Sequence, residues 1–578
     1  MVHPFTVRAR RSRPVPSAGD PSRPSRCSPK GPSVSDWNFA DVWETITSLQ
    51  PDHPAMVRGG VRRSWAEFDD RSGRLAGVLL DAGLGHQAAV ACYLHNSLEY
   101  LETLFACFKG SLIPVNTNYR YVADELRYLW VDADVRAVVF HGTFVERIEE
   151  LRADLPAITC WLWVDDGTGP CPAWALPYEH ALDRGPEQAG SRRRAARSGD
   201  DLFMLYTGGT TGHPKGVMWR QDDLFAVLNR TAQVRFPEEG TVADIAAVLP
   251  APTEPRGRVL PAAPLMHGTA AFAAFGMLGA GGTVVLCEGT RFDVVELLDT
   301  VERERVTDLT IVGDAFARPM LEALDREPGR WDVSSVAVIL SSGVMWSAPI
   351  KEGLIRHMPG VLCVDTLGSS EAVGLARSVS SSTRMASTAG FRLGPDAQVI
   401  REDGTPVEPG SGEVGLVAIG GRGPIGYHGD PEKTARTFRV IGDRRWITPG
   451  DNATVDADGT IHLLGRGSSC INTGGEKVFP EEVEEALKLD NRVLDAVVVG
   501  VPHERFGEMV VAVVETAPVD AVDPEELLDA LRSRLAAYKV PRQLFLTSSL
   551  GRGPNGKIDQ RRWRAEAAEM VARGAGVS

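Results

Sequence analysis

The stretch "LYTGGTTGHPKGVMW", residues 205–219, places glycines, threonines and one lysine between two apolar runs. Residues Phe203 to Tyr206, which come before Thr207 and the glycines, predict a short buried strand. A glycine-rich turn that leaves such a strand presents backbone N–H groups that suit a phosphate. The stretch therefore predicts a nucleotide site.

This loop is not of the Walker A type. Pro214 stands where that motif needs glycine, and no serine or threonine follows Lys215. A second segment, "GRGPNGKI" at 551–558, has the glycine and lysine spacing but ends in isoleucine instead of the hydroxyl that would bind magnesium. The two departures argue against an ordinary P-loop NTPase.

Length and composition limit the class of protein. With 578 residues the chain exceeds a single hydrophobic core, so at least two domains are expected. The net charge of −14 argues against non-specific binding of nucleic acid.

The apolar stretch "TAAFAAFGMLGAGGTVVLCE" is interrupted by glycines, which predicts a core segment and no transmembrane segment. Eight cysteines without a C-x-x-C pair favour a reduced cytoplasmic location.

Two segments have the composition of irregular chain. Residues 1–34 are rich in proline, serine and arginine, which predicts a disordered or misassigned extension. The segment "DRGPEQAGSRRRAARSGDD", 183–201, predicts a solvated surface linker because of its glycines and its run of arginines.

The remaining chain predicts two kinds of architecture. Between about 60 and 370, Val-, Ile- and Leu-rich runs such as "AAVACYL", "RAVVF" and "VAVILSSG" alternate with amphipathic stretches, which is typical of parallel α/β sheets. After Gly465 the pattern changes to a helix from Pro480, the strands "DAVVVGVP" and "EMVVAVVET", and the helix "PEELLDALRSRLA". We expect a large α/β domain with parallel sheets followed by a small, mobile α+β domain.

Five motifs in a fixed order resemble the signature of the adenylate-forming superfamily, which comprises acyl- and aryl-CoA synthetases, nonribosomal adenylation domains and firefly-type luciferases. They are "YTGGTTGHPKGV", "GSSE" at 368–371, "GD" at 450–451, "GRGSSCINTGGEKVFPEEVE" at 465–484 and "PNGKI" at 554–558. The resemblance spans residues 35 to 570, and "CINTGGEKVFPEEVEEAL" with "TPGD" and "KGVMWRQ" is most similar to bacterial long-chain and steroid-side-chain acyl-CoA synthetases.

The resemblance implies an AMP-forming ligase that uses ATP, Mg²⁺ and coenzyme A. A carboxylate attacks ATP to give acyl-AMP, and the thiol of CoA then displaces AMP. The implied organisation is an adenylation and acyl-binding domain at 35–465, a mobile C-terminal domain at 466–570 and a tail at 571–578.

The resemblance also implies the residues that bind ATP. The backbone and hydroxyls of the phosphate loop hold the β- and γ-phosphates, and Lys215 adds positive charge. Glu371 is the implied magnesium ligand, with Ser370 as its hydroxyl neighbour. The loop residues are Thr207, Gly208, Gly209, Thr210 and Thr211.

Further residues follow from the later motifs. Asp451 is implied to accept both ribose hydroxyls and Arg466 to contact ribose or phosphate. Lys557 is implied to stabilise the charge that develops during adenylation. The adenine site is implied to include Ser342, Gly343 and Val344.

Thioester formation is implied to need a rotation of the small domain about a hinge just after Arg466. The rotation brings Gly474 and Gly475 to the pantetheine arm, which they allow to approach closely. His267 is implied to lie beside the acyl pocket. The small residues after it, Gly268 with Ala270 and Ala271, suggest a wide pocket for a bulky or long acid.

Three departures keep other functions open. Leu367 replaces an aromatic that commonly stacks on adenine, Gly208 replaces a serine, and Ser468 replaces a hinge Asp or Lys. The alternatives are a ligase that mainly thioesterifies an acyl-AMP supplied by a partner adenylating enzyme, an adenylation enzyme that loads a carrier protein, and an inactive nucleotide-binding scaffold. Fatty, steroid-side-chain, terpenoid and aromatic acids all stay open, as does assembly into a homo-oligomer.

Overall fold

The computed structural model describes residues 36–185, 197–207, 214–232, 234–249, 256–344, 346–387, 390–466, 471–473, 476–503, 507–517, 522–535, 537–553 and 556–574. The predicted extension at 1–34 lies outside these ranges, and so does most of the predicted linker.

The predicted buried strand before the glycines is β8, a member of an eight-stranded sheet. Its central strands run parallel, and β8 is parallel to β4 but antiparallel to β9. In sheet order the strands are β19 (Gly426–Tyr427), β9 (Lys215–Arg220), β8 (Leu202–Thr207), β4 (Ile113–Asn116), β3 (Ala89–Tyr93), β5 (Val135–His141), β6 (Cys160–Val164) and β7 (Leu176–Pro177). The apolar runs of β3 and β5 are buried, as expected for parallel strands that are covered on both faces.

A second sheet contains fifteen described strands. From β1 to β14 they run parallel, as predicted, and from β15 onward they are antiparallel. In order they are β2 (Val61–Ser64), β1 (Pro54–Arg58), β11 (Thr283–Leu286), β10 (Arg258–Pro261), β12 (Asp308–Ile311), β13 (Val338–Ser342), β14 (Leu362–Leu367), β15 (Ala376–Ser380), β16 (Gly390–Leu393), β23 (Thr460–Arg466), β22 (Asp451–Val455), β18 (Gly415–Ile419), β21 (Arg444–Ile447) and β20 (Phe438–Ile441), while β17 (Ala397–Ile400) pairs with β18.

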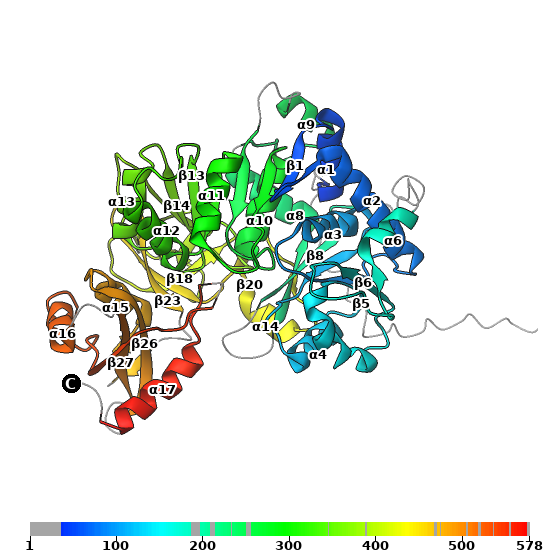
Figure 1. Ribbon diagram of the computed structural model, residues 1–578. Coiled ribbons are helices and arrows are strands. Elements are labelled where there is room, and N and C mark those ends of the chain that lie inside the picture. Colours follow the sequence, from blue (N-terminus) through cyan, green and yellow to red (C-terminus); the bar gives the residue numbers. More distant parts are fainter. Residues whose placement is uncertain are drawn as a thin grey trace, which may run out of the picture. The chain divides into compact units, whose positions relative to one another are not determined.

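The C-terminal part forms a five-stranded sheet of β25 (Glu476–Val478), β24 (Ile471–Thr473), β27 (Gly507–Thr516), β26 (Val493–His503) and β28 (Gln543–Thr547). Side chains alternate along β26, so Val498 packs in a core with α15 (Pro480–Lys488) and α16 (Pro524–Arg532), whereas Val497 and Val499 pack with α17 (Gln560–Ala572). Figure 1 shows these three helices around β26 and β27. The predicted α+β pattern is confirmed, including the helix that begins at Pro480.

The remaining helices connect or cover the two larger sheets (Figure 1). These helices are α1 (Phe39–Leu49), α2 (Trp65–Asp81), α3 (Leu98–Lys109), α4 (Ala123–Asp132), η1 (Gly142–Phe144), α5 (Val145–Glu149), η2 (Arg152–Asp154), α6 (Tyr178–Arg184), α8 (Gln221–Thr231), α9 (Val242–Val248), α10 (Gly268–Gly279), α11 (Val294–Glu304), α12 (Asp314–Arg326), α13 (Ala348–His357) and α14 (Pro431–Thr437). The capping box of Ser64 and Glu67 fixes the start of α2.

The last arginine of the predicted linker is not solvated. Arg197 is only 5% exposed. It donates to both carboxylate oxygens of Glu44, at 2.9 and 2.7 Å, and pairs with Asp41 at 2.9 Å. The prediction of a fully solvated linker is therefore wrong at Arg197, because the acids of α1 provide a partly buried bidentate partner for its guanidinium.

Candidate active site

The predicted phosphate loop connects β8 and β9. Thr207 ends β8 and lies opposite Lys215, the first residue of β9, in the antiparallel register. The predicted loop residues Gly208, Gly209, Thr210 and Thr211 lie outside the described residues. The register therefore fixes both ends of the loop side by side.

Lys215 has an acidic partner that the sequence did not reveal. Its Nζ lies 2.8 Å from the carboxylate of Asp430, and both side chains are partly exposed. The hydrogen bond from Lys215 lowers the pKa of Asp430, and the same bond raises the pKa of Lys215. Asp430 also caps α14, because its Oδ1 accepts the Lys433 N–H at 2.9 Å. Lys215 is thus a cation that Asp430 holds at the end of the predicted loop.

Glu371 is oriented by a tyrosine on β19. The hydroxyl of Tyr427 donates to Glu371 Oε1 at 2.7 Å. Tyr427 is the register partner of Val217, which places this contact beside the strand that carries Lys215. The neighbouring Ser370 is held through its carbonyl, which accepts the indole N–H of Trp219 on the same strand at 2.9 Å. The predicted metal ligand, Glu371, therefore lies close to strand β9, which carries the predicted phosphate-binding lysine, Lys215.

The predicted adenine site follows the carboxyl end of β13. The Ser341 hydroxyl accepts the N–H of Gly313 after β12 at 2.9 Å, and the Ser341 carbonyl accepts the hydroxyl of Thr366 on β14 at 2.9 Å. Gly343 has a φ of +93°, a conformation that favours glycine. Leu367 ends β14 and is half-buried. The carboxyl ends of adjacent parallel strands are where open α/β sheets bind ligands.

The two residues predicted to contact ribose are register partners. Asp451 begins β22 and is buried, and it lies opposite Arg466 at the end of β23. Gly450 directly before Asp451 has a φ of +101°, so the turn into β22 favours glycine. The side chain of Arg466 lies outside the described part of the structure, and so do residues Gly474 and Gly475.

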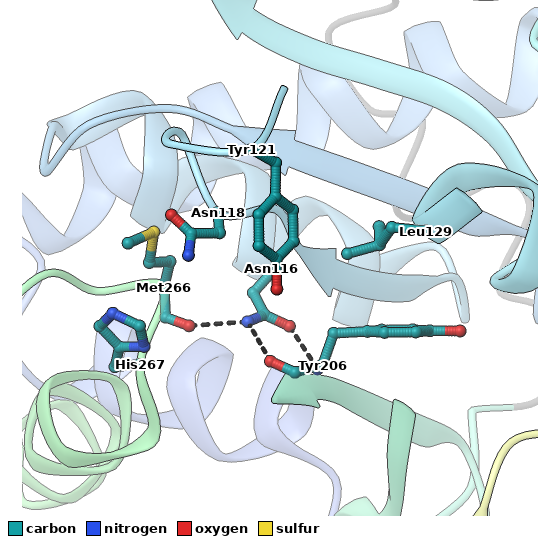
Figure 2. A pocket seen from close by; sticks show the side chains of 7 residues that line it. All are labelled: Asn116, Asn118, Tyr121, Leu129, Tyr206, Met266 and His267. Carbon is teal, nitrogen blue, oxygen red and sulfur yellow. Dashed lines mark hydrogen bonds between the residues drawn. The ribbon is translucent and has the colours of Figure 1, made fainter. Parts of the chain in front are cut away.

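His267 directly precedes α10 and lines a cavity of about 20 Å³, room for a water molecule. Asn116 ties the walls of this cavity together. Its Nδ2 donates to the carbonyls of Tyr206 at 2.9 Å and Met266 at 2.7 Å, and its Oδ1 accepts the Tyr206 N–H at 2.6 Å (Figure 2). Asn116 therefore fixes the end of β8 against the turn that positions His267. The cavity is lined by Asn116, Asn118, Tyr121, Leu129, Tyr206, Met266 and His267.

His267 is neutral near pH 7. Burial lowers its pKa to about 4, and the positive charges of Lys557 and Arg120 contribute in the same direction. Lys557 itself is exposed, in the turn before α17. Two residues that the sequence predicted from motifs 290 positions apart thus lie within electrostatic reach of each other.

Three residues of this site were not predicted from the sequence: Asn116, Tyr427 and Asp430. Asn116 is the polar residue that ends the buried strand β4, a pattern that could have marked it. Tyr427 and Asp430 become recognisable only through the pairing of β19 with β9.

Protein-family models match both parts of the chain. The model of the AMP-binding enzyme matches residues 43–426, and the model of the AMP-binding enzyme C-terminal domain matches residues 482–557. The chain belongs to the AMP-binding enzyme family. The predicted adenylate-forming fold is thereby confirmed.

This AMP-binding enzyme is similar over most of its length to curated ligases. It is 38% identical over 535 residues to 3-oxocholest-4-en-26-oate–CoA ligase of Rhodococcus rhodochrous, which covers 91% of this chain and 95% of the relative. A medium/long-chain-fatty-acid–CoA/3-oxocholest-4-en-26-oate–CoA ligase of Mycobacterium marinum is also 38% identical, covering 92% of this chain and 96% of the relative. The AMP-binding enzyme is therefore an ATP-dependent, AMP-forming acyl-CoA ligase, as predicted.

Solved structures share the fold of this chain. ATP-bound MatB from Rhodopseudomonas palustris is 25% identical with a TM-score of 0.74, and the match covers 92% of this chain and 100% of that chain. The anthranilate CoA ligase AuaEII shares the fold with a TM-score of 0.78 at 20% identity, over 93% of this chain and 98% of that chain. ATP binding is thus supported by the family and by an ATP-bound relative. None of the described helices combines the length and the apolar character that a membrane span requires.

The Lys215–Asp430 pair leads to a prediction about ATP. Asp430→Asn keeps the helix cap, since asparagine caps as well as aspartate, but removes the competing charge. We expect the KM for ATP to fall by up to about fivefold, because a partly exposed ion pair is worth about 0.2–1 kcal/mol. Glu432→Gln is the matched control, because Glu432 is 81% exposed on the same helix and pairs with Arg436 instead. A higher KM for ATP in Asp430→Asn would show that Asp430 assists binding.

Proposed function

We propose that this ligase activates a long or polycyclic apolar carboxylic acid as its acyl-AMP and transfers it to CoA. The observation that carries this proposal is an apolar helix, α10, that leads from His267 to an apolar cavity. The relatives named for 3-oxocholest-4-en-26-oate and for medium- and long-chain fatty acids support the same class of acid.

Helix α10 has the composition of a wall of an apolar site. It contains no charged side chain and only one hydroxyl, that of Thr269. One face is buried in the core, whereas the opposite face, with Phe272 and Ala273, is only half-buried. At Gly276 an added Cβ would meet no atom within 4 Å. Small residues on a partly accessible apolar face leave room for an apolar ligand.

The cavity at the far end of α10 is apolar but has a volume of only about 10 Å³, so the side chains that line it would have to move apart to admit an acyl tail. Its one polar side chain, Asn229, is satisfied by the backbone of Phe236, to which it donates at 2.8 Å and from which it accepts at 2.8 Å. Gly276 follows His267 by nine positions, or about 14 Å along a helix. This distance suits an acid whose tail extends far beyond its carboxylate. The lining residues are Phe39, Phe225, Leu228, Asn229, Ala232, Val234, Phe236, Phe275, Gly276 and Gly279.

In the proposed first step, a carboxylate oxygen of the acid attacks the α-phosphorus of ATP. A new P–O bond forms, and pyrophosphate leaves with the electrons of the bond that breaks. Lys215 and Lys557 supply positive charge to the phosphates, and Asp451 accepts the ribose hydroxyls. Through these contacts the chain holds two anions together that would otherwise repel each other.

Glu371 would hold Mg²⁺, with its carboxylate oriented by the Tyr427 hydroxyl. A single carboxylate of this kind is compatible with Mg²⁺, because this ion is usually bound by one or two carboxylates together with substrate phosphates. When bound, Mg²⁺ neutralises charge on the phosphates.

In the proposed second step, the sulfur of CoA attacks the acyl carbonyl carbon. A C–S bond forms, the C–O bond to AMP breaks, and the thiol proton is released. Because His267 is neutral, it adds no charge beside the reacting carbonyl. We further propose that Gly474 and Gly475 admit the pantetheine arm after a rotation of residues 466–570 against 35–465.

The function is tested by measuring pyrophosphate release with ATP and Mg²⁺ against long-chain, polycyclic and aromatic acids, with and without CoA, followed by mass analysis of the products. We expect release with the long and polycyclic acids, and their CoA esters when CoA is present. No release, together with conversion of synthetic acyl-AMP to the thioester, would instead favour a ligase specialised for the second step. Transfer to a carrier protein in preference to CoA would favour a loading enzyme.

Gly276 provides a prediction about the length of the acid. Gly276→Phe fills the open space on α10, so we expect kcat/KM for the longest acids to fall about tenfold or more while short acids are spared. Gly73→Phe is the matched control, since Gly73 lies within α2 and an added Cβ there also meets no atom within 4 Å. An equal loss for short and long acids in Gly276→Phe would contradict this path for the tail.

Lys557 provides a prediction about the two half-reactions. Lys557→Ala removes charge stabilisation from adenylation only, so we expect acyl-AMP formation to fall about a hundredfold. Transfer of the acyl group from synthetic acyl-AMP to CoA should stay within about twofold of wild type. Each half-reaction is measured by single-turnover product analysis, and an equal loss in both would refute the adenylation role.

A further inference from the structure

The turn before Lys557 is closed by its own backbone. The Gly556 N–H donates to the Gly553 carbonyl at 2.9 Å, and the Gly553 N–H donates to the Lys557 carbonyl at 2.8 Å. Gly556 has a φ of +68°, a conformation that favours glycine. The backbone at Lys557 is therefore held in a tight reversal, even though the lysine side chain is exposed.

Arg552 adds a side-chain bond to this turn. Its Nη1 donates to the Gly556 carbonyl at 2.8 Å, which is the peptide group that leads directly into Lys557. The rest of the guanidinium faces Asp495 on β26. Nη2 donates to Asp495 Oδ1 at 2.9 Å, and Nε donates to Oδ2. The arginine thus connects a strand of the small sheet to the peptide group beside Lys557.

Asp495 is an anchor that stays charged. Its side chain is 14% exposed, and it also accepts Lys488 Nζ at 2.7 Å. Burial alone would raise the pKa of Asp495, but the hydrogen bond from Arg552 and the charges of Arg552 and Lys488 outweigh burial and hold the pKa at about 2. The carboxylate is therefore ionised at any pH at which the enzyme would work.

We propose that Arg552, anchored by Asp495, is a positioning residue that holds Lys557 where adenylation needs its charge. The inference rests on the proposed role of Lys557. A lysine side chain is long and flexible, so the place of its ammonium group depends on how firmly its backbone is held. The three separate nitrogens of the planar guanidinium bond the two oxygens of Asp495 and the Gly556 carbonyl, whereas lysine in place of Arg552 has a single nitrogen and cannot reproduce this spread of donors.

The test compares both half-reactions in Arg552→Lys. We expect acyl-AMP formation to slow about tenfold, and transfer from synthetic acyl-AMP to CoA to stay within about twofold of wild type. Arg492→Lys is the matched control. Arg492 lies in the same five-stranded unit and makes an equivalent bidentate contact, with Asp490 at 3.0 and 2.9 Å, but does not touch the turn. This control should leave the ratio of the two half-reactions unchanged.

A double substitution separates positioning from a general loss of stability. If Arg552 acts through Lys557, then Arg552→Lys should slow acyl-AMP formation no further in a Lys557→Ala background. Equal loss in both half-reactions, or full additivity with Lys557→Ala, would overturn the proposal. If Arg552→Lys does not fold, Asp495→Asn should give the same selective loss, and an unselective effect there would also overturn it.

The same experiment tells the two proposals apart. If Lys557→Ala alone impairs both half-reactions equally, the role of Lys557 in the proposed function fails. If Lys557→Ala is selective for adenylation and Arg552→Lys is not, only the positioning role of Arg552 fails.

Discussion

Strand β9 pairs with β8 on one side and with β19 on the other, and these two pairings bring distant parts of the chain together. The first pairing sets Lys215 opposite Thr207, so both ends of the predicted phosphate loop are fixed. The second places Tyr427 where its hydroxyl can orient Glu371. A one-residue slip of β9 would turn its side chains to the opposite face and separate the lysine from the glutamate. The register of this one strand therefore determines whether a site for ATP can exist.

Charge in the site is balanced locally. Lys215 is held by Asp430 and Arg552 by Asp495, so each cation has a carboxylate that fixes its place. A partnered charge costs less to bury than an isolated one, so the carboxylates allow both cations to be held partly buried. His267 differs from these cations, because burial lowers its pKa and it is neutral at the start of the apolar helix α10. Lys215 is thus held in an ion pair, whereas His267 at the start of the apolar helix α10 carries no charge of its own.

The sequence predicted the parts of this enzyme whose signal is local. Apolar runs predicted the parallel strands, and Pro480 marked the start of α15. In the fifteen-stranded sheet, the antiparallel strands from β15 to β23 were not predicted, because most of them are short and only partly buried. Motifs indicated Lys215, Glu371 and Asp451, but not the residues that hold them. Asp430 could not be predicted because its contact with Lys215 spans 215 positions, and the burial of Arg197 depends on acids in α1.

The most direct test of the proposed site is a crystal structure with a long-chain acyl sulfamoyl adenosine, a stable analogue of the acyl-AMP. We expect the adenosine to lie at the carboxyl ends of β13 and β14, with its ribose at Asp451. We also expect the acyl chain to follow α10 from His267 past Gly276 into the cavity beside α8. An acyl chain that leaves the site in another direction, or an adenosine bound away from Asp451, would contradict the proposed site.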